Sequence, residues 1–132
     1  MFLTAWEGKL VGWHEGRAVF ELLSPLIYET KNGKIHEVPT GFQNDRCSVP
    51  RHPAILYGWL GDKLYRQGTL HDFAFRKDAG FTFNEANELL LESCDDHYEG
   101  ETDEVQIHIM YEAVKLCGMG SYHKYNVMDR LV

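Results

Sequence analysis

A proline-bounded segment, residues 39–50, divides this sequence of 132 residues into two parts with different periodicity. Before it, short apolar runs alternate with turn residues, as is typical of antiparallel strands. After it, apolar residues recur at helical spacing. This order predicts a single α+β domain over residues 1–132. We expect a small N-terminal antiparallel β-sheet of hairpins (1–40), a motif loop (41–51), and a C-terminal bundle of three to four helices (52–132).

Two hairpin turns are expected in the β-rich part. Asn32-Gly33 lies between two strand-like runs, and Asn-Gly at such a place is the strongest short hairpin signal because both residues tolerate positive φ. His14-Glu15-Gly16 marks the second expected turn. The strands expected beside these turns span residues 10–13, 17–22, 26–29 and 34–38.

The helical part has its clearest start at Thr82, which can form a capping box with Glu85 three residues later. The helix before it is expected to be interrupted or restarted around Gly68. One face of the helix that starts at Thr82 carries Phe83, Asn87, Leu90 and Cys94. The expected helices begin near residues 54, 62, 82 and 103, and an acidic loop is expected at 95–102. The tail at 121–132 carries no pattern that predicts its structure.

Composition narrows the classes of function. The net charge is -7, from 20 acidic and 13 basic side chains, so nucleic acid is not an expected partner. The first residues lack the pattern of a signal peptide, and no apolar run approaches the roughly 20 residues that span a bilayer. Three cysteines without C-x-x-C spacing favour reduced thiols over a zinc site, with one disulfide as the alternative for a protein that works outside the cell.

A histidine and a carboxylate, His71 and Asp72, are adjacent in a stretch expected to be helical. Adjacent helical side chains project about 100° apart, so the two can address neighbouring points of one cleft. The histidine could accept a proton and the aspartate could bind a hard cation. The alternative is an ordinary pair on a helix surface. The apolar flanks favour a largely buried helix, in which an ionisable pair needs partners.

The motif loop carries a second candidate carboxylate, Asp45. With nearby carbonyl groups, Asp45 could bind calcium or magnesium. Alternatively, it caps backbone amides and pairs with Arg51. Asn87, on the apolar face of its helix, also needs a partner, and the His71 ring and the backbone are equal candidates. Ser48 lacks a G-x-S-x-G frame, which argues against a serine nucleophile.

Together these clusters resemble a family, the phage-associated domain of unknown function 1353. The residues that carry the resemblance are Val38-Pro39-Thr40-Gly41-Phe42, Asp45-x-x-Ser48-Val49-Pro50-Arg51 and His71-Asp72. The resemblance covers roughly residues 27–117. This sequence departs from the family pattern at Asn44 (Thr in the family), Phe75 (Tyr) and Asn87 (Asp). The resemblance implies a bacteriophage or prophage origin and a place in the host cytoplasm or the virion. Other phage proteins or a host factor are the partners it implies.

The order D-x-C-S-x-P, then H-D-F-x-x-R, then a partner helix is also similar to bacterial secreted phospholipases of the A-two type. That likeness implies that His71 activates water and that Asp72 and Asp45 hold Ca²⁺. It places Asn87 where an acidic residue orients the histidine, and Asn can accept an Nδ1–H bond without stabilising an imidazolium. The expected supporting residues are Ser48, Arg51 and Arg76.

The sequence is therefore compatible with two main functions. The first is a metal-assisted, hydrolase-like domain with His71 as general base. The second is a non-catalytic virion or assembly protein, in which the same motifs tie the motif loop to the helices. A third reading is a protein that binds a host factor through its acidic face.

Overall fold

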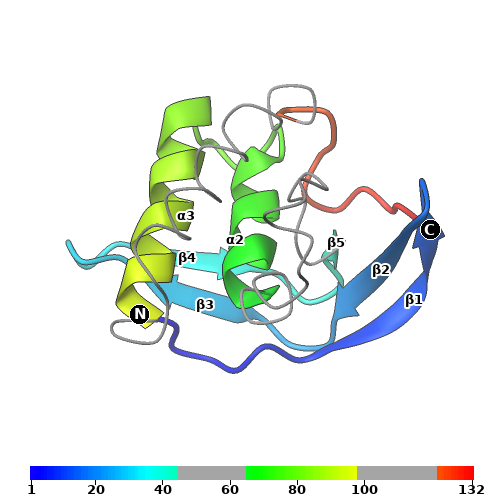
Figure 1. Cartoon of the computed structure of the whole chain (residues 1–132), viewed down its shortest axis with the longest axis horizontal. Helices are drawn as coiled ribbons and strands as arrows, with labels where there is room; N and C mark the ends of the chain where they lie inside the picture. Colours follow the sequence, from blue (N-terminus) through cyan, green and yellow to red (C-terminus); the bar gives the residue numbers. More distant parts are fainter. Residues whose placement is uncertain (45–64, 98–121) are drawn as a thin grey trace, which may run out of the picture.

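The computed structural model describes residues 1–44, 65–97 and 122–132. It confirms the α+β class, with antiparallel strands first and helices after them (Figure 1). The strands are β1 (Gly8–His14), β2 (Arg17–Leu22), β3 (Leu26–Glu29), β4 (Ile35–Val38) and β5 (Gln43–Asn44), and the helices are α2 (Tyr65–Phe75) and α3 (Phe83–His97).

Both predicted hairpins are confirmed. β1 and β2 pair antiparallel around Glu15-Gly16, whose φ angles of 51° and 77° are both positive, as a tight two-residue turn requires. β3 and β4 also pair antiparallel. Their turn differs from the expectation, because Gly33 takes a positive φ of 86° whereas Asn32 does not. Thr30 closes this longer turn, and its hydroxyl oxygen accepts a bond from the Lys34 N–H at 2.9 Å.

The strands form two sheets rather than the single small sheet that was expected. One sheet has the order β1-β2-β5 and the other pairs β3 with β4. β5 lies inside the segment expected to be an irregular loop. Its two residues carry little strand signal, and they pair because the chain after β4 returns to lie against Phe20 and Glu21 of β2.

The second part of the chain contains two helices among its described residues, so the bundle of three to four helices is not supported there. The helices expected near 54 and 103 lie outside the described residues. α2 runs unbroken through Gly68, which corrects the expected interruption. α3 follows the predicted capping box, in which Thr82 N–H donates to Glu85 Oε1 (2.9 Å) and Glu85 N–H donates to Thr82 Oγ1 (3.1 Å). It continues to His97, so the expected acidic loop does not begin at residue 95.

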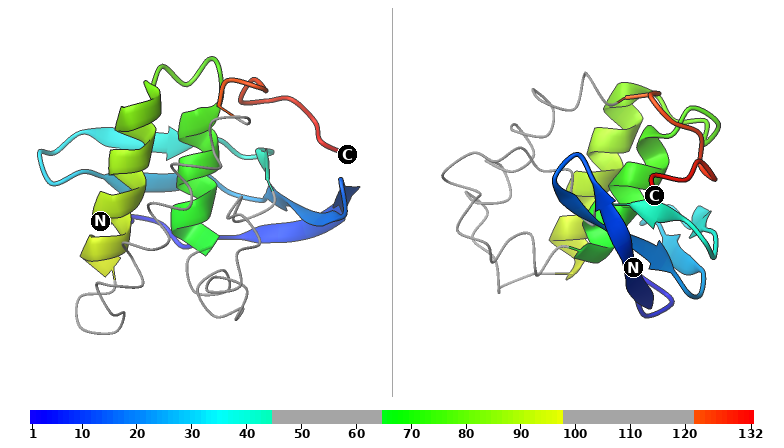
Figure 2. Two further views of the ribbon diagram at one scale, coloured as in Figure 1. Left: turned by 45° about the horizontal axis from the view of Figure 1, so that its top comes forward. Right: turned by 90° about the vertical axis from the view of Figure 1, so that its right-hand side faces the viewer.

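The two helices lie side by side across the β-layer (Figures 1 and 2). The predicted apolar face of α3 is confirmed, because Asn87, Leu90 and Cys94 are buried and Phe83 is half-buried. The main core contains side chains from both hairpins, both helices and the tail: Leu22, Leu26, Tyr28, Val38, Phe42, Leu70, Ala74, Phe75, Ala86, Leu89 and Val127. None of the helices that the structure describes is long and apolar enough to cross a bilayer.

Residues 122–132, which we call the C-terminal strap, run from the end of α2 back to the β1–β2 hairpin (Figures 1 and 2). Backbone bonds fix its start, with His123 N–H donating to Phe75 O (2.9 Å) and Lys77 N–H donating to Tyr125 O (2.8 Å). Its end packs on Gly12, where an added Cβ would lie 2.5 Å from Val132 Cγ1. This arrangement could not be predicted from the sequence, because residues 122–132 have no regular hydrophobic period.

Candidate functional site

The candidate site is built on α2, which is buried on opposite faces and carries polar side chains on both. The buried polar residues of α2 and its C-terminal end are Gln67, Thr69, His71, Asp72 and Arg76. At about 100° per residue they divide into two groups. Thr69 and Arg76 bond to residues of β5, and helix spacing places Asp72 on their face. His71 bonds to α3, and helix spacing places Gln67 on its face.

His71 forms the link to α3. Its Nε2 lies 2.9 Å from Asn87 Oδ1, and its ring centroid lies 4.1 Å from that of Phe75. The side chain is 4% exposed. Burial lowers the pKa of His71 to about 4, because it disfavours the charged ring more strongly than the bond to Asn87 favours it. The ring is therefore neutral at pH 7. Of the two expected partners for Asn87, the structure shows the imidazole.

This bond also fixes the position of the ring proton. A carbonyl oxygen only accepts, so Nε2 donates to Asn87 Oδ1 and carries the proton. In a neutral ring the other nitrogen, Nδ1, is then the proton acceptor. The orienting bond was expected at Nδ1, and the structure corrects that expectation. Which ring nitrogen faces Asn87 depends on how the two helices are placed, which sequence spacing does not specify.

The opposite face of α2 holds the beginning of the motif loop. Thr69 Oγ1 donates to Asn44 Oδ1 at 3.2 Å and accepts from Trp6 Nε1 at 3.1 Å. Arg76 Nη2 donates to the carbonyl oxygen of Gln43 at 2.9 Å. The last two residues of the motif loop that the structure describes, Gln43 and Asn44, are thus fixed to the face of α2 that also carries Asp72.

Asp72, the expected metal ligand on α2, is 9% exposed. It lies three residues from Thr69 and four from Arg76, so it shares their face rather than that of His71. The other expected ligand, Asp45, and the supporting residues Ser48 and Arg51 lie outside the described residues. Among the residues that the structure describes, no three His, Cys, Asp or Glu side chains form a group that could hold a metal ion.

Arg76, expected as a supporting residue, has a clear structural role. Besides Gln43, its guanidinium donates through Nη1 to the carbonyl oxygen of Asn126 at 3.1 Å. It also lies 4.8 Å from the ring centroid of Phe42, a cation–π geometry. Arg76 therefore joins the end of α2, the beginning of the motif loop and the C-terminal strap.

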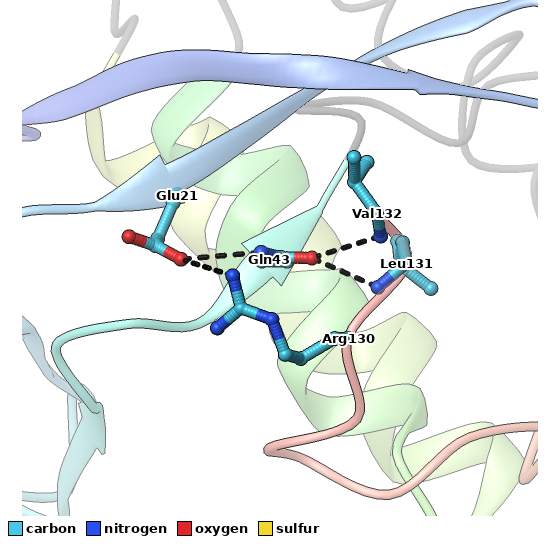
Figure 3. A network of polar contacts seen from close by, with 5 residues as sticks. All are labelled: Glu21, Gln43, Arg130, Leu131 and Val132. Carbon is cyan, nitrogen blue, oxygen red and sulfur yellow. Dashed lines mark hydrogen bonds and ion pairs between the residues drawn. The ribbon is translucent and has the colours of Figure 1, made fainter.

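Gln43 is a residue of this region that sequence reasoning missed. Its side-chain amide donates to Glu21 Oε1 at 3.1 Å and accepts from the N–H groups of Leu131 (2.8 Å) and Val132 (3.2 Å), as Figure 3 shows. Arg130 adds an ion pair to Glu21 at 3.6 Å. The strap is thus bonded to β5, which lies within the motif loop. A lone Gln in a polar segment gives no signal of such a role.

Gln67 was also missed, and it differs from Gln43. It is fully buried, yet neither Nε2 nor Oε1 of its amide has a hydrogen-bond partner in the part of the chain that the structure describes. Its only sequence signal is its position four residues before His71, which places the two side chains on one face of α2.

A comparison with protein families gives one finding. A family model described as "Protein of unknown function (DUF1353)" matches residues 20–114, which is more than half of the chain. The matched span contains β3, β4, β5, the motif loop, α2 and α3. No curated protein and no solved structure gives a significant match.

Proposed function

The chain belongs to the DUF1353 family of proteins of unknown function. We propose that it is a small hydrolase-like domain, and from the resemblance described above we propose a phage or prophage origin. His71 is the general base in this proposal. The observation that supports it is the bond between His71 Nε2 and Asn87 Oδ1, which leaves Nδ1 as the proton acceptor of a neutral ring.

The pKa of about 4 has two consequences for this role. The ring is unprotonated across the neutral range, so nearly all molecules have a free acceptor nitrogen. The same low pKa makes Nδ1 a weak base, because a catalytic pKa near the working pH is the most effective. Burial causes this weakness, and the bond to Asn87 offsets it only in part, since an amide cannot stabilise an imidazolium as a carboxylate does.

The proposal also includes a cation, for which α2 supplies one carboxylate. Asp72 is a buried carboxylate, the type of ligand that Ca²⁺ prefers. In the proposal Asp72 and Asp45 hold the ion, which would supply positive charge to stabilise an oxyanion. Ser48 and Arg51 support the motif loop. Arg76 holds Gln43 and thereby the start of that loop against the Asp72 face of α2.

The likeness to phospholipases of the A-two type suggests a carboxylic ester as substrate. A direct test is hydrolysis of a short-chain phospholipid and of p-nitrophenyl acetate, with and without calcium. The proposal predicts ester hydrolysis that is lost in a folded His71→Asn variant. His36→Asn is the matched control, because His36 is half-buried against Phe81 (5.0 Å between ring centroids) and takes no part in the site. Equal hydrolysis by His71→Asn and the wild type would exclude His71 as base.

A second candidate function is favoured by the depth of His71. Its ring is 4% exposed and ties α2 to α3, which is also what a purely structural histidine would do. The protein would then be a non-catalytic virion or assembly protein that binds other phage proteins or a host factor. In that case His71→Asn lowers the free energy of unfolding, and the wild type hydrolyses no ester.

A further inference from the structure

One buried side chain of α2 and one of α3 carry polar atoms whose hydrogen bonds are not accounted for. They are Nε2 and Oε1 of Gln67 and Nδ2 of Asn87, and none has a partner among the described residues. Gln67 is fully buried and Asn87 is 1% exposed. Buried polar groups in native proteins almost always have a partner, either protein or ordered water. Several such atoms together indicate a bound molecule rather than an isolated defect.

A hydrogen bond relates Asn87 to the His71 ring, and helix spacing relates Gln67 to it. Asn87 Nδ2 belongs to the same amide whose oxygen accepts the His71 bond. Gln67 is four residues before His71, so the two side chains are neighbours on one face of α2. A helical side chain also leans towards the turn that precedes it, which directs His71 towards Gln67. The free acceptor of the ring, Nδ1, is therefore part of the same polar group.

The chemistry of the group identifies the class of ligand. Gln67 Oε1 and His71 Nδ1 accept hydrogen bonds, while Gln67 Nε2 and Asn87 Nδ2 donate them. The group carries no formal charge, because both amides and the imidazole are neutral. A ligand with both donors and acceptors and no charge satisfies it, and water has this combination.

We propose that Gln67, His71 and Asn87 form a buried hydration site between α2 and α3, in which ordered water bridges Gln67 to Asn87 and donates a hydrogen bond to His71 Nδ1. The presence of this water follows from the unpartnered amides alone. Its role rests on the proposed function, in which His71 polarises the water held at Nδ1.

The site is tested by magnetisation transfer from water to side-chain amide protons in the ¹⁵N-labelled full-length chain. Gln67 and Asn87 are expected to show cross-peaks at the water frequency. Gln43 is the matched control, since it is equally buried (1% exposed) and its amide is bonded to Glu21, Leu131 and Val132. Gln43 is expected to show no such cross-peak. The absence of a cross-peak at Gln67 would overturn the hydration site.

A variant gives an independent readout. Gln67→Met keeps the length of the side chain and removes its polar atoms. If water is bound there, the substitution takes away its partners and lowers Tm; an unchanged or raised Tm would overturn the site, because removing a truly unpartnered amide relieves a cost. If the variant does not fold, the wild-type cross-peaks decide. Cross-peaks in a protein that hydrolyses no ester would refute the proposed function and leave the hydration site standing.

Discussion

His71 makes the stability of the fold depend on pH. Its folded pKa of about 4 lies below the ordinary value of 6.5, so the unfolded chain binds a proton between these values and the folded chain does not. The contribution of the neutral ring is complete above about pH 6.5 and is lost as the pH falls towards 4. A shift of this size corresponds to roughly 3 kcal/mol.

The first prediction follows from that linkage. Between pH 7 and pH 4 the wild type should lose a few kcal/mol more unfolding free energy than His71→Asn, which lacks the titrating ring. Urea unfolding at several pH values measures both curves. His36→Asn serves as the control, and it should keep most of the wild-type pH dependence. Parallel curves for wild type and His71→Asn would show that His71 is not held neutral by the fold.

A second prediction at this scale concerns the residue that faces His71. Asn87→Asp places a carboxylate at the Nε2 proton, and an opposite charge in contact should raise the pKa of His71 by about 1–3 units. NMR titration of the His71 ring measures this directly. Glu88→Gln, a change at the next and exposed residue of α3, should leave the His71 pKa in place. A similar pKa in wild type and Asn87→Asp would mean that the two side chains do not pair in solution.

Sequence spacing was sufficient to put Asn87 on the apolar face of its helix and to name His71 as a candidate partner. It could not specify that Nε2 makes the bond, since this depends on the distance and rotation between two helices. For Gln67 the sequence offered only its spacing of four residues from His71, which does not specify that its amide is buried without a partner.

At the scale of elements, the sequence predicted correctly those elements whose turn or cap is formed by residues close together in the chain. The two hairpins and the start of α3 each carry a turn or cap in a few consecutive residues. β5 and the continuity of α2 carry none. A strand of two residues exists only because β2 offers a partner. Gly68 disfavours a helix in isolation, and here α2 is buried on both sides, so tertiary packing overrides that preference.

The capping box gives the third prediction. Thr82→Ala removes the side-chain oxygen that accepts from Glu85 N–H, and the free energy of unfolding should fall by about 1 kcal/mol. Asn84→Ala, at an exposed position of the same first turn, should change it by less than about 0.5 kcal/mol. Denaturant unfolding of the two variants compares them. Equal stability of Thr82→Ala and the wild type would mean that the helix start is held by packing instead of the cap.

At the scale of the whole molecule, the C-terminal strap and β5 connect parts of the chain that lie far apart in sequence. Gln43 bonds to Glu21 of β2 and to the strap (Figure 3). Arg76 bonds to Gln43 and to Asn126 of the strap. The α+β class was predictable because it follows from the order of periodicities. The strap was not, since its contacts are single bonds between distant residues.

The fourth prediction tests this connection. Gln43→Leu removes bonds to Glu21, Leu131 and Val132 and leaves their polar groups without the amide, so the free energy of unfolding should fall by about 2–4 kcal/mol. Arg130→Ala is the matched control within the same network (Figure 3), and its exposed ion pair should contribute less than about 1 kcal/mol. A loss in Gln43→Leu no larger than that in Arg130→Ala would contradict the role of Gln43 as an anchor.

In the proposed function, neutral His71 is a general base whose pKa is lowered by burial and raised in part by the bond to Asn87. The pH dependence of kcat/KM for ester hydrolysis tests it most directly, because that ratio reports the pKa of the essential base in the free protein. The wild type is predicted to show a rate that rises through about pH 4 and levels off above it. In Asn87→Asp the midpoint is predicted to move to higher pH. Absence of hydrolysis at every pH, or a midpoint that is the same in both proteins, would contradict the claim.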